Sequence, residues 1–95
     1  MSAYVVVDIH ITDTENFESY KQAVPRSIAQ YGGRYLVRGG KAETLEGVWS
    51  PGRVVVLEFP SLEQARAWYE SAEYAEPKAL RHACARSNII LVEGM

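Results

Sequence analysis

The sequence predicts an α+β fold in which four antiparallel strands carry helices on one face, in the order strand, helix, strand, strand, helix, strand. Two patterns predict this order: segments in which every second residue is apolar, and segments in which apolar residues recur every three or four positions. Glycine and proline mark most of the junctions. With 95 residues the chain has room for one core, so residues 1–95 are expected to form a single domain.

The first strand is predicted over residues 4–11, because its odd-numbered positions are all apolar while Asp8 and His10 fall on the opposite face. A helix follows, with Asp13 or Thr14 as its N-cap, and ends near residue 31. Pro25 removes a backbone donor inside this helix, so we expect a kink or a restart there. The expected buried stripe is Phe17, Tyr20, Val24, Ile28 and Tyr31.

Gly32 and Gly33 are expected to stop this helix. The second strand is predicted over residues 34–38 and the third over residues 53–59, with Val55, Leu57 and Phe59 on one face. The connection between these strands is predicted to be a turn and a loop with a short strand extension.

Ser61 and Gln64 fit a capping box, which predicts a second helix from residue 61 to residue 71. The stretch "EYAEP" is expected to break it, and Pro77 is placed well to begin a short further helical piece. We expect Ala79, Leu80 and Ala83 to face inward from that piece. A fourth strand is predicted from residue 87 to the end of the chain.

This order of elements is the ferredoxin-like βαββαβ pattern, in which both helices cover the same face of a four-stranded antiparallel sheet. The other face is left bare, and a largely apolar sheet face is not expected to stay open to water. We therefore expect a homodimer that pairs through this face. Its expected residues are Tyr4, Val6, Asp8, His10, Leu36, Val54, Val56, Glu58, Ile90 and Val92.

Composition and charge exclude several classes of partner. Ten basic and twelve acidic residues give a net charge of -2, without any basic block along the chain, so neither nucleic acid nor an anionic membrane is an expected partner. The N-terminal apolar run has no basic region before it and is interrupted by Asp8 and His10, which fits neither a signal peptide nor a membrane span. We therefore expect a cytoplasmic location.

The chain also resembles a known family, on motifs that occur in order along most of its length. These are "GGRYLVRGG", in which Tyr31 precedes the first glycine where the common form has His, then "LEG", "VVVLEFPSLEQARAWYES", and "EY" followed by a helical Arg81. They resemble the bacterial DUF1330 family. The resemblance implies a dimeric α/β barrel, in the same broad group as antibiotic-biosynthesis monooxygenases, muconolactone isomerase-like proteins and haem-degrading monooxygenases. It implies no particular activity.

Asp8 and His10 are the candidate catalytic residues. They lie two positions apart on one strand, so their side chains point to the same face. A carboxylate beside an imidazole can orient a general base that works near neutral pH. The alternative is that His10 is solvated at the strand end while Asp8 pairs with a neighbouring arginine.

Arg34 and Arg38 are the candidate ligand-binding pair, expected on one face of the second strand together with Leu36. A guanidinium offers a planar fork to a carboxylate or phosphate, so the two side chains could hold an anionic ligand at the mouth of a cleft. Alternatively, Arg38 forms a salt bridge with Glu58 or Glu46 and the glycines serve turn geometry. Tyr20 and Glu58 complete the candidate ligand-binding set.

No cofactor or metal is predicted. His82 on the last helical piece resembles an iron ligand of the haem-degrading relatives only superficially, since no second histidine lies at metal-ligand spacing. Cys84 is the one cysteine of the chain, so an internal disulfide is excluded. It is expected to be a small buried residue. The tyrosines and tryptophans of the helices are expected mainly in the core.

Two functions follow from these predictions. The first is a protein that binds a small anionic or aromatic molecule in a cleft between sheet and helices, as a cofactor-independent isomerase or monooxygenase-like enzyme with His10 as base, Asp8 as its orienting partner and Arg38 as anion clamp. The second is a non-catalytic structural or stress-related homodimer whose interface is filled. A cavity reached by Arg38 and His10 would favour the first.

Overall fold

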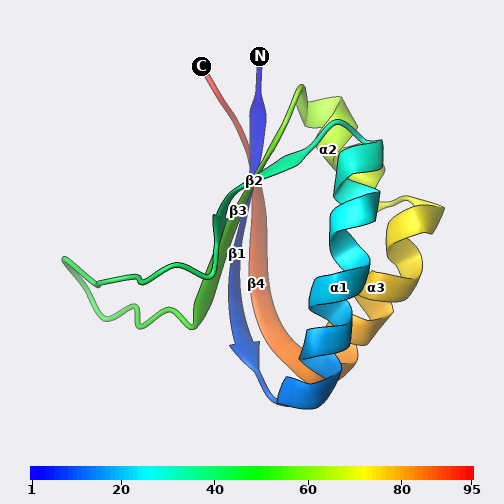
Figure 1. Ribbon diagram of the computed structural model, residues 1–95. Helices are drawn as coiled ribbons and strands as arrows, with labels where there is room; N and C mark the ends of the chain where they lie inside the picture. The colour runs from blue at the N-terminus through cyan, green and yellow to red at the C-terminus, as the bar shows by residue number, and fades with distance from the viewer.

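A computed structural model describes all 95 residues, and its sheet runs β2-β3-β1-β4 with every neighbouring pair antiparallel. All the helices lie on one side of the sheet, and the opposite face is bare (Figure 1). This confirms the predicted α+β, ferredoxin-like arrangement. The elements are β1 Ala3–Ile11, α1 Thr14–Gln30, β2 Arg34–Arg38, β3 Arg53–Phe59, α2 Leu62–Tyr69, α3 Ala72–Cys84 and β4 Ala85–Glu93.

The strand register assigns the residues of β1, β3 and β4 to the faces that the sequence predicts. Val5 pairs with Leu57 and Leu91, and Val6 pairs with Val56 and Ile90. Paired residues in an antiparallel sheet point to the same side, so the Val5 row faces the helices and the Val6 row faces away from them. The alternation of apolar side chains therefore predicts the faces correctly, and it excludes any register shifted by one residue.

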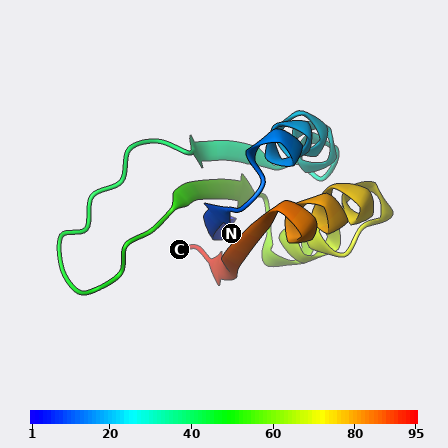
Figure 2. The same cartoon turned by 90° about the horizontal axis from the view of Figure 1, so that it is seen from below.

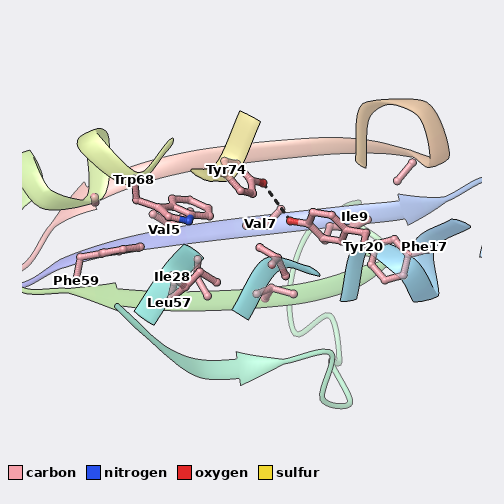
Figure 3. Packing of buried hydrophobic residues seen from close by; sticks show 14 of the residues in the cluster. Val5, Val7, Ile9, Phe17, Tyr20, Ile28, Leu57, Phe59, Trp68 and Tyr74 are labelled. Atoms are coloured by element: carbon pink, nitrogen blue, oxygen red, sulfur yellow. Dashed lines mark hydrogen bonds between the residues drawn. The ribbon is translucent and has the colours of Figure 1, made fainter. Parts of the chain in front are cut away.

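The core lies between the helices and the sheet, and Trp68 and Tyr74 are its largest fully buried side chains (Figure 3). Their rings are 4.2 Å apart between centroids, and the Trp68 indole Nε1 donates to Ser27 Oγ at 3.1 Å. Full burial of such a side chain is worth about 2–3 kcal/mol, and this indole loses nothing to an unmade hydrogen bond. The core prediction for the helical aromatics is confirmed here.

Each helix begins at a polar N-cap, but the break between α2 and α3 differs from the expected one. Asp13 and Ser61 cap α1 and α2 as predicted, and Ser71 caps α3 by accepting from the Tyr74 amide at 3.1 Å. The helix thus restarts at residue 72, and Pro77 lies inside α3 rather than at its start.

The buried stripe of α3 also differs from the prediction. Ala79 and Ala83 are exposed and Leu80 is only half-buried. The cause is the earlier start of the helix, which changes the face that meets the sheet. The buried residues are instead Tyr74, Pro77, Arg81 and Cys84.

Helix α1 ends as expected but is continuous through its proline. Gly32 has φ 77°, a left-handed conformation that glycine adopts without strain, and stops the helix. Pro25 lies within the single helix from Thr14 to Gln30, so no restart occurs there.

Residues 39–52, between β2 and β3, form an extended arm that projects away from the body of the molecule on the side opposite the helices (Figures 1 and 2). The arm contains no strand, contrary to the predicted extension. Leu45, Val48 and Trp49 on it are exposed apolar side chains. None of the helices combines the length and the hydrophobicity that crossing a membrane requires.

Candidate functional site

A cavity lies under the helices, between α1, α3 and the sheet, with a free volume of about 30 Å³. Its walls are mostly apolar, with Phe17, Trp68 and Val55 among them, and its polar lining residues are cationic or phenolic. A volume of this size holds about two water molecules. The seven cationic or phenolic residues that line it are Tyr20, Lys21, Tyr35, Arg38, Arg53, Tyr74 and Arg81.

The charge of this cavity is positive and uncompensated. Three arginines and one lysine line it, and no aspartate or glutamate does. None of the three arginines forms a salt bridge with a carboxylate within 4.0 Å, whereas Lys21 meets Glu18 at the surface at 3.2 Å. Cations in a low-dielectric setting attract anions strongly, so the cavity favours an anionic occupant.

A β-bulge directs Arg38 toward this cavity. Arg34 pairs with Glu58, but the register shifts between Tyr35 and Val37, so that Arg38 pairs with Val55 on the helix-facing side. One extra residue reverses the face of everything that follows it in a strand. The prediction that Arg34 and Arg38 share a face is therefore wrong.

Arg38 contacts a tyrosine ring and a backbone carbonyl rather than a glutamate. Its guanidinium lies 4.6 Å from the centroid of the Tyr35 ring, and Nη2 donates to the backbone carbonyl of Lys21 at 2.7 Å. Within the chain Arg38 forms no salt bridge with Glu58 or Glu46. The bulge turns Arg38 to the face opposite Glu58, whose carboxylate pairs with Arg34. Arg38 is exposed, so it stands at the rim of the cavity, at the mouth where it was expected.

Arg53 stands beside Arg38 and was not predicted as a site residue. It begins β3 on the helix-facing side, opposite Ile9, with its guanidinium 5.6 Å from the centroid of the Phe17 ring. Its Nε is buried without a hydrogen-bond partner. The signal that could have found it is its position two residues before Val55, on the apolar face of a strand with period two.

Tyr20, a predicted ligand-binding residue, lines the cavity from α1. Its hydroxyl lies 3.1 Å from that of Tyr74, and the two point toward each other across the core (Figure 3). Burial, followed by the neighbouring Tyr74 phenol, raises the pKa of Tyr20 far above its usual range. Tyr20 is thus a neutral donor and acceptor at any physiological pH.

Arg81 is the most buried charge of the cavity, at 3 % exposure. Its Nε donates to the Tyr74 hydroxyl at 3.3 Å, and its Nη2 has no hydrogen-bond partner. Burial alone lowers the pKa of this guanidinium, but the surrounding phenols of Tyr74, Tyr20 and Tyr69 together outweigh it and the net shift is upward. Sequence analysis gave Arg81 no role, although its spacing of seven from Tyr74 and three from Cys84 places all three on one helix face.

Arg34 and Glu58 lie together on the bare sheet face, away from the cavity. Arg34 Nε donates to Glu58 at 2.7 Å, and the Tyr4 hydroxyl donates to the same carboxylate at 3.3 Å. The hydrogen bond from Arg34 is the main cause that holds the pKa of Glu58 below its usual value, and the hydrogen bond from Tyr4 lowers it further. These two predicted ligand-binding residues satisfy each other and do not meet Arg38 or Tyr20.

Asp8 and His10 also lie on the bare face, where they anchor the arm. The Asp8 carboxylate accepts from Trp49 Nε1 and from the Gly52 amide, both at 2.8 Å, and His10 Nε2 lies 3.4 Å from it. The hydrogen bond from Trp49 is the main cause that lowers the pKa of Asp8. The predicted Asp8–His10 approach is present, but neither residue lines the cavity.

Two further residues considered in the sequence are placed as follows. Cys84 is fully buried, and burial raises the pKa of its thiol, which matches a small core residue. His82 is exposed on α3. His, Cys, Asp and Glu side chains do not gather in threes anywhere, so the chain offers no such ligand set for a metal ion.

The fold and the cavity define a class of protein: a ferredoxin-like α+β domain with a cationic, largely apolar cavity beneath its helices. The chain belongs to the family described as a domain of unknown function, DUF1330, which it matches over residues 2–95. A search of curated proteins finds no match to it.

Solved structures share the fold at low sequence identity. The RPA0582 protein of unknown function from Rhodopseudomonas palustris is 16 % identical with a TM-score of 0.81, over 99 % of this chain and 82 % of that one. SnoaB, a cofactor-independent oxygenase from Streptomyces nogalater, is 13 % identical with a TM-score of 0.64, over 99 % and 93 %. A protein from Bacteroides thetaiotaomicron described as a possible oxidoreductase is 15 % identical with a TM-score of 0.64, over 98 % and 97 %. Identities this low establish the fold alone.

Proposed function

We propose that this protein binds a small anionic molecule with an apolar or aromatic body in the cavity between the helices and the sheet. The observation that carries the proposal is a lining with three arginines, no carboxylate and a largely apolar wall that includes five aromatic side chains. Ligand sites are usually apolar with a few convergent polar groups, and the excess of cations selects the sign of the ligand's charge.

A ligand of ring size needs the cavity to open. Ligand pockets typically have volumes of about 300–1,000 Å³, and this one has about 30 Å³. Arg38 is the side chain placed to open it, since it is exposed and is held by one hydrogen bond to the Lys21 carbonyl and by its contact with Tyr35. A ligand whose aromatic ring takes the place of Tyr35 against the guanidinium compensates for that contact.

Cofactor-independent chemistry of isomerase or monooxygenase type is the enzymatic extension of this proposal. It is supported by the fold shared with SnoaB, a cofactor-independent oxygenase. A catalytic role of His10 and Asp8 stays a prediction, and it requires a second ligand site on the outer sheet face. The alternative is a non-catalytic structural or stress-related homodimer whose interface is filled.

Binding is tested by thermal shift and calorimetry with a set of aromatic acids on the wild type, Arg38→Met and Arg34→Met. Arg34 is the matched control, since it lies on the same strand but on the opposite face. We expect the acids to stabilise the wild type and Arg34→Met, and to stabilise Arg38→Met less. Equal stabilisation of all three would place binding elsewhere, and no stabilisation at millimolar acid would favour the non-catalytic alternative.

We also propose that two copies pair through the bare sheet face. Ile90, Val92 and Val37 are exposed apolar side chains on or beside it, and Leu45 and Val48 on the arm add apolar surface on the same side of the molecule. Exposed apolar surface that continues from a sheet onto an arm is typical of an interface. Light scattering after size exclusion should give about twice the chain mass of 10.6 kDa.

A further inference from the structure

Arg81, Tyr74 and Tyr20 are the buried polar residues at the inner end of the cavity. Together they have more hydrogen-bond donors than acceptors. Arg81 donates through Nε to the Tyr74 hydroxyl, and that hydroxyl lies 3.1 Å from the hydroxyl of Tyr20. A guanidinium supplies donors only, whereas each phenol supplies one donor and can also accept. Arg81 Nη2 is buried and has no acceptor.

One phenolic proton is also left without an acceptor, whichever way the pair is arranged. If Tyr74 donates to Tyr20, the hydroxyl hydrogen of Tyr20 has no acceptor; if Tyr20 donates to Tyr74, that of Tyr74 has none. The two phenols form no other hydrogen bond except the one that Tyr74 accepts from Arg81. The cluster therefore lacks acceptors for two neighbouring groups, a guanidinium nitrogen and a phenol.

The missing acceptor is anionic. Arg81 is 3 % exposed and has no carboxylate partner anywhere in the chain. Buried charges are ordinarily paired, because an unpaired one loses its hydration and receives nothing in return. Buried donors are satisfied by protein, water or ligand, and water supplies no negative charge.

We propose, resting on the function proposed for this cavity, that its ligand is a monocarboxylic acid whose carboxylate lies innermost. One carboxylate oxygen accepts from Arg81 Nη2, and the other accepts from the free hydroxyl of the Tyr20–Tyr74 pair. The apolar body of the acid lies toward Arg38 at the cavity mouth.

A carboxylate suits the site better than larger or neutral groups do. Its two oxygens lie in one plane and match two adjacent donors. The free volume of about 30 Å³ holds about two water molecules, which is the room that two oxygens need. A phosphate or sulfonate brings a third or fourth oxygen without a donor here, and an amide brings a donor where the cluster needs acceptors.

The experiment compares benzoate, benzamide and benzenesulfonate, with acetate as the carboxylate alone, by calorimetry on the wild type at pH 7.5. Benzoate is expected to bind at least ten times more tightly than benzamide and benzenesulfonate, and acetate to compete with it. If benzamide binds as tightly as benzoate, and Arg38→Met weakens both, the cavity is a ligand site but the carboxylate proposal is wrong. If none of the four binds at 10 mM, both proposals fail.

Variants then test the individual contacts. Arg81→Met is expected to abolish benzoate binding while raising the melting temperature of the free protein, because it removes an unpaired buried charge and keeps its volume. The double variant Tyr20→Phe/Tyr74→Phe is expected to weaken benzoate binding about fivefold, the loss of one hydrogen bond, because in either single variant the remaining hydroxyl is free to donate to the carboxylate. Arg34→Met is expected to leave benzoate binding unchanged. A destabilised Arg81→Met protein that retains benzoate affinity would show that Arg81 is structural and would overturn the proposal.

Discussion

The Arg38 guanidinium donates to the backbone carbonyl of Lys21 at 2.7 Å, and this carbonyl is the one that Pro25 leaves without a helical donor. In an α-helix the carbonyl of residue i accepts from the amide of residue i+4, and proline has no amide hydrogen. Pro25 thus frees a helix carbonyl at the mouth of the cavity, and Arg38 from β2 supplies the missing donor.

A double-mutant cycle tests this relationship. Arg38→Met is expected to lower the free energy of unfolding by about 0.5–1.5 kcal/mol in the presence of Pro25. It should cost less after Pro25→Ala, because the new amide then bonds the Lys21 carbonyl. The coupling free energy from urea unfolding of the four proteins should be about 0.5–1 kcal/mol. The loss of the Arg38 contact with Tyr35 cancels in the cycle, so strictly additive effects would contradict the relationship.

Gly39 and Gly40 are adjacent but predicted to differ in their tolerance of a side chain. Gly39 has φ 74°, and a Cβ on it would collide with the Arg53 guanidinium, whereas nothing lies within 4 Å of a Cβ on Gly40. Gly39→Ala should lower the free energy of unfolding by about 1–2 kcal/mol, and should weaken acid binding by moving Arg53.

Gly40→Ala is the matched control and should remain within about 0.5 kcal/mol of the wild type. Chemical denaturation of both variants checks the pair. A neutral Gly39→Ala would show that the strand end relaxes and that Arg53 is not confined there.

The faces of the long strands could be predicted because β-structure has a strict period of two. That Tyr4 and Glu58, or Asp8 and Val54, share one face follows from apolar alternation alone, whereas their direct pairing does not, because a shift of two residues keeps every face. The approach of His10 to Asp8 follows from the same rule. What alternation cannot reveal is which side a ligand uses, and the cavity proved to lie on the face opposite Asp8 and His10.

The position of Arg38 could not be predicted, because a bulge depends on how two strands fit together. Nothing in "RYLVR" marks an extra residue, since it contains neither glycine nor proline. The start of α3 could not be predicted from the sequence, for a related reason. Pro77 removes one helical hydrogen bond, but the Ser71 cap and the burial of Tyr74 and Arg81 stabilise the helix around it.

The anchor of the arm at Asp8 is predicted to weaken only in acid. Hydrogen bonds from Trp49 and Gly52 favour the ionised carboxylate and lower its pKa below the ordinary value of 3.8. A group with a lowered folded-state pKa contributes its stabilisation fully above the unfolded pKa, and loses it as the pH falls through the lower, folded value. The anchor should therefore be unchanged from pH 7 to pH 5 and weaken below about pH 4.

The indole N–H signals of the two tryptophans report this transition in nuclear magnetic resonance spectra. The Trp49 signal should shift below pH 4, while that of Trp68, bonded to Ser27, serves as the internal reference. Asp8→Asn should lower the free energy of unfolding by about 1–3 kcal/mol at pH 7 and by progressively less as the pH falls below about 4. A Trp49 signal that is identical in Asp8→Asn and wild type would exclude the anchor.

The bare sheet face is predicted to be sensitive to a charge at its centre. Ile90 pairs with Val6 there and is 58 % exposed in the single chain. In a sheet-to-sheet dimer, Ile90→Lys buries two unpaired ammonium groups, one from each copy, so dimerisation should weaken by at least about 100-fold, or about 2.7 kcal/mol.

Ala79→Lys, on the exposed side of α3, is the control and should leave the mass in solution unchanged. Light scattering over a range of protein concentrations distinguishes the outcomes. An Ile90→Lys protein that remains a dimer at the wild-type dissociation constant would move the interface to another surface. A wild type that is monomeric at 100 µM would contradict the dimer itself. The arm would then need a different partner, because exposed apolar side chains grouped as Leu45, Val48 and Trp49 are on one arm are seldom left in water.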